Sequence, residues 1–239
     1  MIKFFRNIRR QLLGVGKTGK YFKYAIGEIL LVMIGILLAL QVNNWNESRK
    51  SYNNEIKLVK QLLEDAKADS VFFKSRIMHQ QIRDTLYNNL ILANKGLASD
   101  SLLRTEVHDD PFFFRLAYQS NLINNNPEAY DLISNDSIKT MLRTYKARYD
   151  YVVHSIELNN RLSEEYGVPM QIKYFENIRK LQEQPLLVDL NFTYNDSEST
   201  AIFSMLKTYG VNYYIQVDRF LEKNQQLIVL IESYLTGNH

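Results

Sequence analysis

Residues 24–45 read YAIGEILLVMIGILLALQVNNW, and this apolar stretch decides how the chain is organised. Residues 29–40 contain no polar side chain, whereas a helix that packs on a soluble core keeps a polar face. Together with its aromatic flanks the stretch covers the 25 residues 21–45, and a helix needs about 20 residues to cross the hydrocarbon core of a bilayer. The sequence therefore predicts a single transmembrane helix over residues 21–45.

The residues on either side of this stretch predict its orientation. The seven charged residues before Ala25 are all basic: Lys3, Arg6, Arg9, Arg10, Lys17, Lys20 and Lys23. Lys and Arg close to a span stay on the cytoplasmic side, and Trp45, the only tryptophan, marks the opposite interface as an aromatic anchor. We expect a protein of the bacterial inner membrane with a cytoplasmic N-terminus and a periplasmic domain over residues 46–239.

Residues 1–20 form a basic leader with an amphipathic pattern. Ile2, Phe5, Ile8 and Leu12 recur at helical spacing, while Lys3, Arg6, Arg9 and Arg10 occupy the other side. This pattern predicts a short helix on the anionic inner leaflet; a disordered basic tail is the alternative. The formal net charge of +3 divides into +7 before Ala25 and −4 after it. The positive charge therefore indicates topology and lipid contact rather than nucleic-acid binding.

Two alternatives to a permanent anchor involve cleavage or lipid attachment. A cleavable signal peptide needs small residues in an A-x-A pattern, and residues 39–43, ALQVN, do not supply one. The chain has no cysteine, which excludes a lipidated cysteine here and leaves no disulfide or thiol chemistry. We therefore expect an uncleaved anchor.

One face of the predicted membrane helix carries Glu28, Gly35 and Ala39, which lie close in angle at 100° per residue. Small residues allow close helix contact in a membrane, and an acidic side chain within a span usually faces protein or water. This face predicts a contact with another membrane helix. The alternative is that Glu28 extends to the nearby interface and that Gly35 and Ala39 have no contact role.

The N-terminal part of the chain resembles a widespread family of short single-span membrane proteins from Bacteroidetes bacteria that is catalogued only as a domain of unknown function. The resemblance lies in the leader MIKFFRNIRRQLL and in KYFKYAIGEILLVMIGILLALQVNNWNE, with a looser match in NNNPEAYDLISN. It covers about the first 47 residues closely. The resemblance implies a topology and a lineage, and it implies no activity.

The remainder of the chain predicts a mainly α fold, with an antiparallel helical bundle after the anchor. No glycine or proline occurs between Trp45 and Gly96, and apolar residues recur there at three- and four-residue steps from Leu58 to Ala93, as in a long helix. Ser70 and Gln80 interrupt this stripe, which favours a bundle helix over a two-stranded coiled coil. A second long helix is predicted over residues 197–235, with Asp196 as its cap.

Shorter helices are predicted between the two long ones. Residues 112–114, FFF, are expected to pack on the core at a helix start; a partner contact is the alternative for part of this run. A helix is predicted over residues 137–165, and its aromatic stripe is expected to face the core. Gly167 and Pro169 are expected to end that helix, and a further helix is predicted over residues 170–182. Short helical and extended segments are predicted near residues 100–107 and 186–194.

The sequence offers no catalytic, cofactor-binding or metal-binding constellation. The four histidines stand far apart, and no spacing supports metal binding or acid–base pairing. We therefore expect no enzyme and no cofactor. The favoured function is a structural or accessory protein-binding subunit of a membrane complex. Its expected partners are membrane lipid and other membrane or periplasmic proteins, self-association included.

The alternative function is a periplasmic ligand-binding sensor that signals through a partner. Tyr149 and Tyr151 are candidates to line an amphipathic pocket in such a sensor. A closed apolar pocket lined by tyrosines would favour the sensor, whereas an exposed apolar strip on the bundle would favour the accessory subunit.

Overall fold

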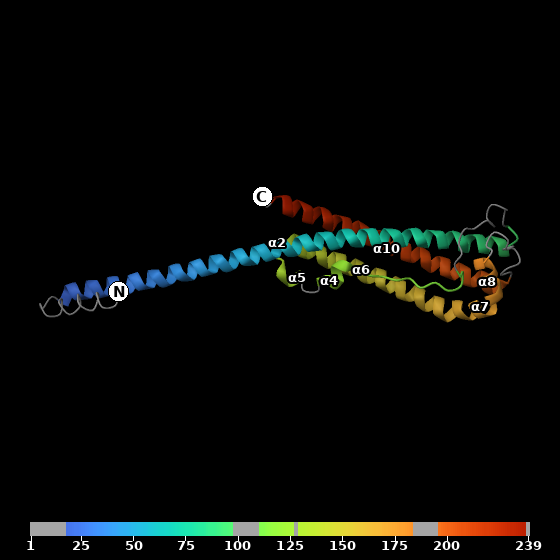
Figure 1. Ribbon diagram of the computed structural model, residues 1–239, viewed down its shortest axis with the longest axis horizontal. Coiled ribbons are helices and arrows are strands. Elements are labelled where there is room, and N and C mark those ends of the chain that lie inside the picture. The colour runs from blue at the N-terminus through green and yellow to red at the C-terminus, as the bar shows by residue number, and fades with distance from the viewer. Residues whose placement is uncertain (1–17, 98–109, 127–128, 184–195, 238–239) are drawn as a thin grey trace. The chain divides into compact units, whose positions relative to one another are not determined.

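The structure, a computed structural model, describes residues 18–97, 110–126, 129–183 and 196–237 (Figure 1). Every regular element in these ranges is helical, in agreement with the predicted mainly α fold. The chain divides into two compact units, Met1–Glu55 and Ile56–His239. The predictions for residues 1–17, 100–107 and 186–194 lie outside the described residues.

The longest element is α2, a continuous helix over Thr18–Asn94 that contributes to both units. It confirms the long helix predicted after the anchor and joins it to the apolar stretch without a break. The helix ends where Gly96 adopts a φ of 68°, a left-handed conformation that favours glycine. Leu97 N then donates to Leu92 O and closes the last turn.

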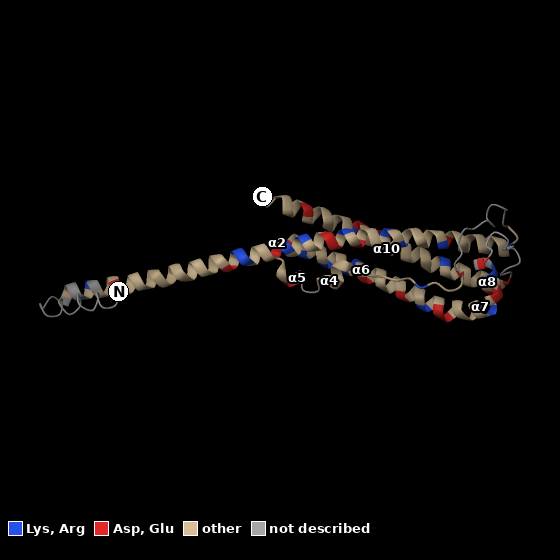
Figure 2. Ribbon diagram, in the orientation of Figure 1, with Lys and Arg blue, Asp and Glu red and all other residues tan. Residues whose placement is uncertain are grey.

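In the first unit, the apolar side chains of α2 are exposed on all sides. Among the large apolar residues from Phe22 to Trp45, exposure ranges from 46% for Leu30 to 69% for Phe22. Within the described residues, α2 is the one helix that is long and apolar enough to cross a membrane. Figure 2 shows the same stretch as a run of helix almost free of charged residues. The identity of the membrane and the orientation of the helix stay predictions.

The second unit is a helical bundle in which α10, Ser197–Gly237, runs antiparallel to α2 (Figure 1). At one end Asn94 Nδ2 donates to Thr200 Oγ1 at 2.9 Å, and toward the other Asn224 Nδ2 donates to Ala66 O at 2.8 Å. The third long element, α6, covers Asp136–Leu162 and begins with Asn135 as its cap. The predicted antiparallel bundle is therefore present, and its position relative to a membrane stays a prediction.

Aromatic rings form the centre of the main core, where α2, α6 and α10 meet. Phe220 lies 4.8 Å from Phe73 and 4.9 Å from Tyr145, measured between ring centroids. Such ring pairs contribute about 0.5–1.5 kcal/mol beyond their buried area. The aromatic stripe of α6 packs into this core as predicted, and the buried face of α10 divides between this core and a second cluster that includes Phe112. Ile82 belongs by spacing to the apolar stripe predicted from Leu58 to Ala93, but it is 45% exposed.

A glycine allows α10 to approach α2 closely. A Cβ atom at Gly210 would lie 2.0 Å from Gln80 Nε2 and 2.9 Å from Asp84 Oδ1, so no larger residue fits while Gln80 keeps its place. Gln80 itself is 2% exposed. The residue that interrupts the apolar stripe in the sequence therefore faces the interior of the bundle.

The region around Gly167 differs from the sequence prediction. The helix does not end at Gly167 and Pro169; instead α6 continues into a π-helical turn, Ser163–Gly167, and then into α7, Val168–Lys173. Pro169 lies at the start of α7, directly after the π-helical turn. After a break at Tyr174, α8 covers Phe175–Glu183.

The second difference concerns the run of phenylalanines. Phe112 is fully buried and stacks on Phe203 and Tyr174, so the prediction of core packing is confirmed. It does not start a helix. Residues 110–120, called the strap below, contain no helix, and the next helices are α4, Asn121–Asn125, and α5, Ala129–Leu132.

Candidate functional site

The predicted membrane-helix residues lie in the first unit, on α2. Ala39 is exposed and Glu28 is half-buried, while a Cβ atom at Gly35 would meet nothing within 4 Å. The described part of the chain thus leaves room for a neighbour at Gly35. The contact of this face with another helix stays a prediction.

The other predicted residues of this region are the interface anchor and the basic leader. Trp45 is 64% exposed, and the guanidinium of Arg49 lies 5.4 Å from the centroid of its ring, which suits an amphipathic ring at a membrane surface. Lys3, Arg6, Arg9 and Arg10 lie outside the described residues, so their lipid contact stays a prediction.

In the second unit, the most elaborate set of polar contacts holds the strap. Side chains from α2, α6 and the π-helical turn bind the strap through its backbone. Arg83 Nη2 donates to Asp110 O at 3.0 Å, and Ser163 Oγ accepts from Phe114 N at 3.0 Å. Ser163 Oγ also lies 3.4 Å from Phe112 O, to which it donates.

Asn160 makes the most complete of these contacts, because its amide pairs with both backbone groups of one residue. Leu116 N donates to Asn160 Oδ1 at 2.7 Å, and Asn160 Nδ2 donates to Leu116 O at 2.9 Å. The contacted strap residues are therefore 110, 112, 114 and 116, every second position. Helix side chains here satisfy backbone groups that a neighbouring strand would satisfy in a sheet.

Asp69 on α2 binds the end of the strap and the start of α4. Its carboxylate accepts from Ser120 Oγ at 2.7 Å, from Asn121 N at 2.6 Å, from Leu122 N at 3.3 Å and from the Tyr145 hydroxyl. Asp69 is fully buried, and a buried carboxylate is tolerated only with such partners. It also places negative charge at a helix N-terminus, where the charge is favourable.

Tyr145 serves this arrangement as a donor. Burial, and then the adjacent charge of Asp69, raise the pKa of the Tyr145 hydroxyl well above its usual value of 10. The hydroxyl therefore stays protonated at neutral pH and donates a hydrogen bond to the Asp69 carboxylate.

Arg83 is a further buried charge of this site, only 2% exposed. Besides binding Asp110 O, its Nη2 donates to Tyr87 Oη at 2.9 Å, and its guanidinium lies 4.2 Å from the centroid of the Phe114 ring. Asp110 lies nearby, with Oδ1 accepting from Phe112 N at 2.8 Å and Oδ2 accepting from Gln171 Nε2 at 2.5 Å. Burial raises the pKa of Asp110, and these hydrogen bonds partly oppose that rise.

The chemistry of this site is that of a clamp. Asp69, Arg83 and Asn160 each contact backbone or side-chain groups of the same chain, and the two buried charges, Asp69 and Arg83, have hydrogen-bond partners in or beside the strap. Within the described ranges, no group of three or more His, Asp or Glu residues is placed to hold a metal ion.

Outside the clamp, the structure confirms the prediction that Asp196 caps the helix α10. Asp196 Oδ1 accepts from Ser199 N at 2.6 Å at the start of α10. Partial burial would raise its pKa, but hydrogen bonds from Lys173, Tyr174 and Ser199 outweigh burial and hold the pKa well below 3.8. The ionised form therefore stabilises the folded protein at neutral pH.

Replacing Asp196 with Asn is expected to lower the stability of the second unit at pH 7, because Asn keeps the cap but removes the charge. Stability linked to a lowered carboxyl pKa is present above the unfolded-state value of 3.8 and is lost as the pH falls below it. The difference between wild type and variant should therefore shrink in urea unfolding curves taken from pH 7 down to pH 2. Glu198→Gln, which alters an exposed partner of Lys173, is the control and should have a smaller effect; equal effects at all pH values would refute the linkage.

The described residues thus form a helical protein. One of its helices is long and apolar enough to cross a membrane, and side chains of its bundle bind the backbone of the strap. Residues 28–94 match the model of a family of unknown function, DUF6090. The match confirms the predicted resemblance to a family known only as a domain of unknown function, and the bacterial lineage stays a prediction. No curated protein and no solved structure matches the chain.

The matched region includes Asp69 and Arg83, which the sequence prediction did not single out. A signal was present, because both residues fall on the helical phase of Leu62, Phe73 and Leu90, among residues that are fully buried. A charge at a core position of a helix usually has a fixed partner. Asn160 and Ser163 gave no comparable local signal.

Proposed function

We propose that this protein is a single-pass membrane protein with a cytoplasmic N-terminus, whose second unit lies in the periplasm and acts as an accessory protein-binding subunit of a membrane complex. The exposed apolar stretch of α2 in the first unit supports the anchor. The basic leader and Trp45 support the orientation.

The observation that carries the binding role is an exposed apolar strip on α2 within the second unit. Val71 is 71% exposed, Met78 is 55% exposed and Ile82 is 45% exposed. Large apolar side chains that share one helix face at the surface of a folded unit are typical of sites that bind other proteins.

The positions of Tyr149 and Tyr151 do not favour the alternative function, a ligand-binding sensor. Tyr149 is 7% exposed and its ring packs against Phe73 and Phe220, whereas Tyr151 is 59% exposed. The two side chains therefore belong to different faces of α6 and do not line one pocket together. Tyr145 likewise packs in the core, in T-shaped contact with Phe220.

Affinity purification of the full chain from native membranes, in mild detergent and through a C-terminal tag, tests this role. Mass spectrometry is expected to find a reproducible set of other membrane or periplasmic proteins with it. A tagged protein with the same anchor but an unrelated soluble domain is the control. Recovery of the chain alone, or only with further copies of itself, would overturn the accessory role.

The predicted membrane contact has its own variant test. Gly35→Ile combined with Ala39→Ile should weaken a close helix contact by about 1–2 kcal/mol, which is roughly a tenfold loss of associated protein. Crosslinking in native membranes measures the loss. Leu30→Ile with Leu37→Ile, on the opposite face of the helix, is the matched control; unchanged crosslinking of the Gly35 and Ala39 variant would remove this contact from the proposal.

A further inference from the structure

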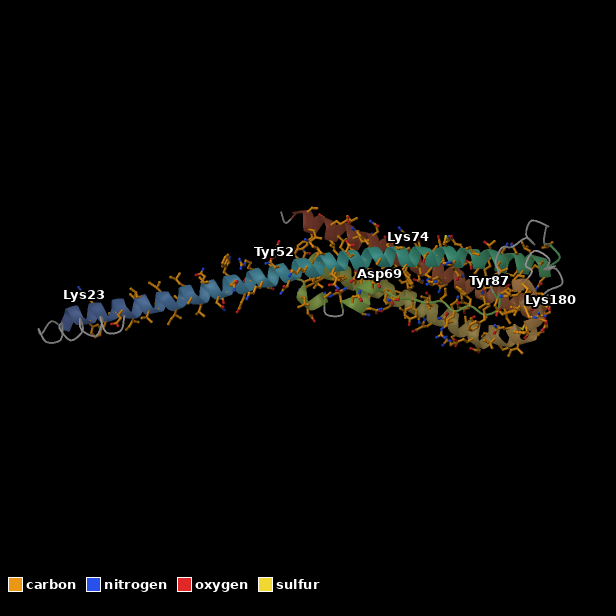
Figure 3. All side chains as sticks on the ribbon, in the orientation of Figure 1. Lys23, Tyr52, Asp69, Lys74, Tyr87 and Lys180 are labelled. Atoms are coloured by element: carbon orange, nitrogen blue, oxygen red, sulfur yellow. The ribbon has the colours of Figure 1, made fainter. Side chains whose placement is uncertain are left out.

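The buried apolar residues of the second unit form two separate clusters along the bundle. The main core is built around Phe220, and the second core contains the rings of Tyr87, Phe112 and Phe203. In Figure 3, Asp69 on α2 marks the level of the main core, while Tyr87 lies farther along the same helix, toward the end of the unit where Figure 1 labels α7 and α8. The unit therefore contains two cores that follow each other along its length.

The helices that pass from one core to the other change character between them. These are α2, α10 and the continuous run from α6 through the π-helical turn into α7. In residues 74–85, 157–169 and 207–212, all of which the structure describes, every buried position is polar or glycine. These six positions are called the polar layer below: Gln80, Arg83, Asn159, Ser163, Gly167 and Gly210.

The polar layer separates the stabilisation of the two cores. Burial of apolar surface contributes about 25 cal/mol per Å², and the buried positions of the layer supply little of it. Gln80 also carries a cost, because its Oε1 atom is buried without a hydrogen-bond partner among the described residues. A fold with two separately packed cores can open at one of them without unfolding the other.

The strap crosses the polar layer as well. Its Phe112 ring lies in the second core, whereas its Leu116 side chain belongs to the main core. Between these two residues, Ser163 of the polar layer accepts from Phe114 N and donates to Phe112 O. The strap is therefore bound at the point where it passes from one core to the other.

We propose that the second core opens as a cooperative unit while the main core stays folded, with the polar layer as the boundary and the strap as the link that holds the second core closed. Opening exposes the stacked rings of Phe112, Tyr174 and Phe203. The inference goes beyond the proposed function, because it concerns the second unit alone and requires no partner protein. The two can therefore fail separately.

The direction of opening follows from the elements around each core. The main core is the larger of the two among the described residues, and its centre lies between the long helices α2, α6 and α10. The second core depends in part on α7 and α8, which have 6 and 9 residues. Helices shorter than about 12 residues are marginal without tertiary contacts, so we expect the second core to open first.

Hydrogen exchange of the full chain in detergent, followed by mass spectrometry, measures such openings. Amides of residues 86–93, 170–173 and 202–206 around the second core should exchange about tenfold faster, or more, than those of residues 66–73 and 217–228 in the main core. Equal rates in the two sets would overturn the proposal. This comparison needs no substitution.

Phe203→Leu tests whether the second core opens as one unit. The variant should speed exchange in all three second-core segments by the same factor of about ten, because a cavity in this core weakens every element packed on it. Acceleration confined to residues 202–206 would indicate fraying of one helix end, and the proposal would then be wrong.

Phe220→Leu is the matched variant, since it makes the same change on the same helix and both rings are fully buried. The main core is folded before and after the second core opens. This variant should therefore leave the second-core segments unchanged and speed exchange in the main core about tenfold. Equal acceleration of both sets would show that the second unit unfolds as one block, contrary to the proposal.

Ser163→Ala tests the strap as the link. The change removes the hydrogen bonds to Phe112 O and Phe114 N, and it should speed exchange of the second-core segments about fivefold. Ser155→Ala is the control, because Ser155 is also buried but donates to Val152 O of its own helix. Equal effects of the two variants, or no effect of Ser163→Ala, would overturn the role of the strap.

Discussion

Replacing Asp69 with Asn is expected to lower the free energy of unfolding of the second unit by about 3 kcal/mol or more, because a buried acceptor becomes partly a donor. The carboxylate binds Ser120 Oγ, Asn121 N, Leu122 N and the Tyr145 hydroxyl. The new amide group would face at least one of these donors, and the fully buried position admits little rearrangement. Urea unfolding of the full chain in detergent, followed by tyrosine near-ultraviolet circular dichroism, measures the change.

Asp65→Asn is the matched control for this experiment. Asp65 lies on the same helix and accepts from Asn125 Nδ2 at 3.1 Å and Asn126 Nδ2 at 2.7 Å, but it is only half-buried. Its replacement should cost about 0.5 kcal/mol, as is usual near a surface. If both variants lost the same stability, Asp69 would not be the fixed point of the clamp.

The second large effect is expected at Gly167. A Cβ atom there would lie 2.0 Å from Phe112 O, a backbone atom of the strap. The strap or the π-helical turn must then move, which strains the contacts that Ser163 and Asn160 make to it, and overpacking of this kind costs about 1–3 kcal/mol. Gly167→Ala should therefore destabilise the unit in the same unfolding experiment.

The sign of the stability change in Gly167→Ala distinguishes crowding by the new Cβ atom from the higher helix propensity of alanine. In an exposed helix, Gly→Ala stabilises by about 1 kcal/mol, so crowding must reverse the usual outcome. Gly237→Ala is the control, since a Cβ atom at Gly237 meets nothing within 4 Å. An unchanged or raised stability of Gly167→Ala would show that the strap does not lie against the turn as described.

Local sequence information predicted the elements whose stability is local. The apolar stretch, the long helix after it and the buried faces of α6 and α10 follow from spacing and composition. Asp196 was recognised as a cap from its position before a helix, and Asn135 takes the corresponding position before α6. Each of these features depends on residues within a few turns of one another.

The clamp could not be predicted in this way, because its contacts join distant parts of the chain. Leu116 and Asn160 are separated by 44 residues, and Phe114 and Ser163 by 49. The phenylalanine run therefore looked like a helix start, although the strap follows helix side chains instead. Asp69 and Arg83 were overlooked for another reason: only the apolar residues of α2 were used to define its buried face, although these two charged residues lie at buried positions of the same helix.

The strap also imposes an order on synthesis. Because Asn160 and Ser163 follow the strap residues that they bind by 44 and 49 residues, they leave the ribosome roughly 2 to 10 s later at usual elongation rates. During that interval the Phe112 ring cannot yet stack on Phe203 of α10 or on Tyr174, the residue directly after α7. The nascent chain must therefore carry the apolar Phe112 segment without its binding site for seconds.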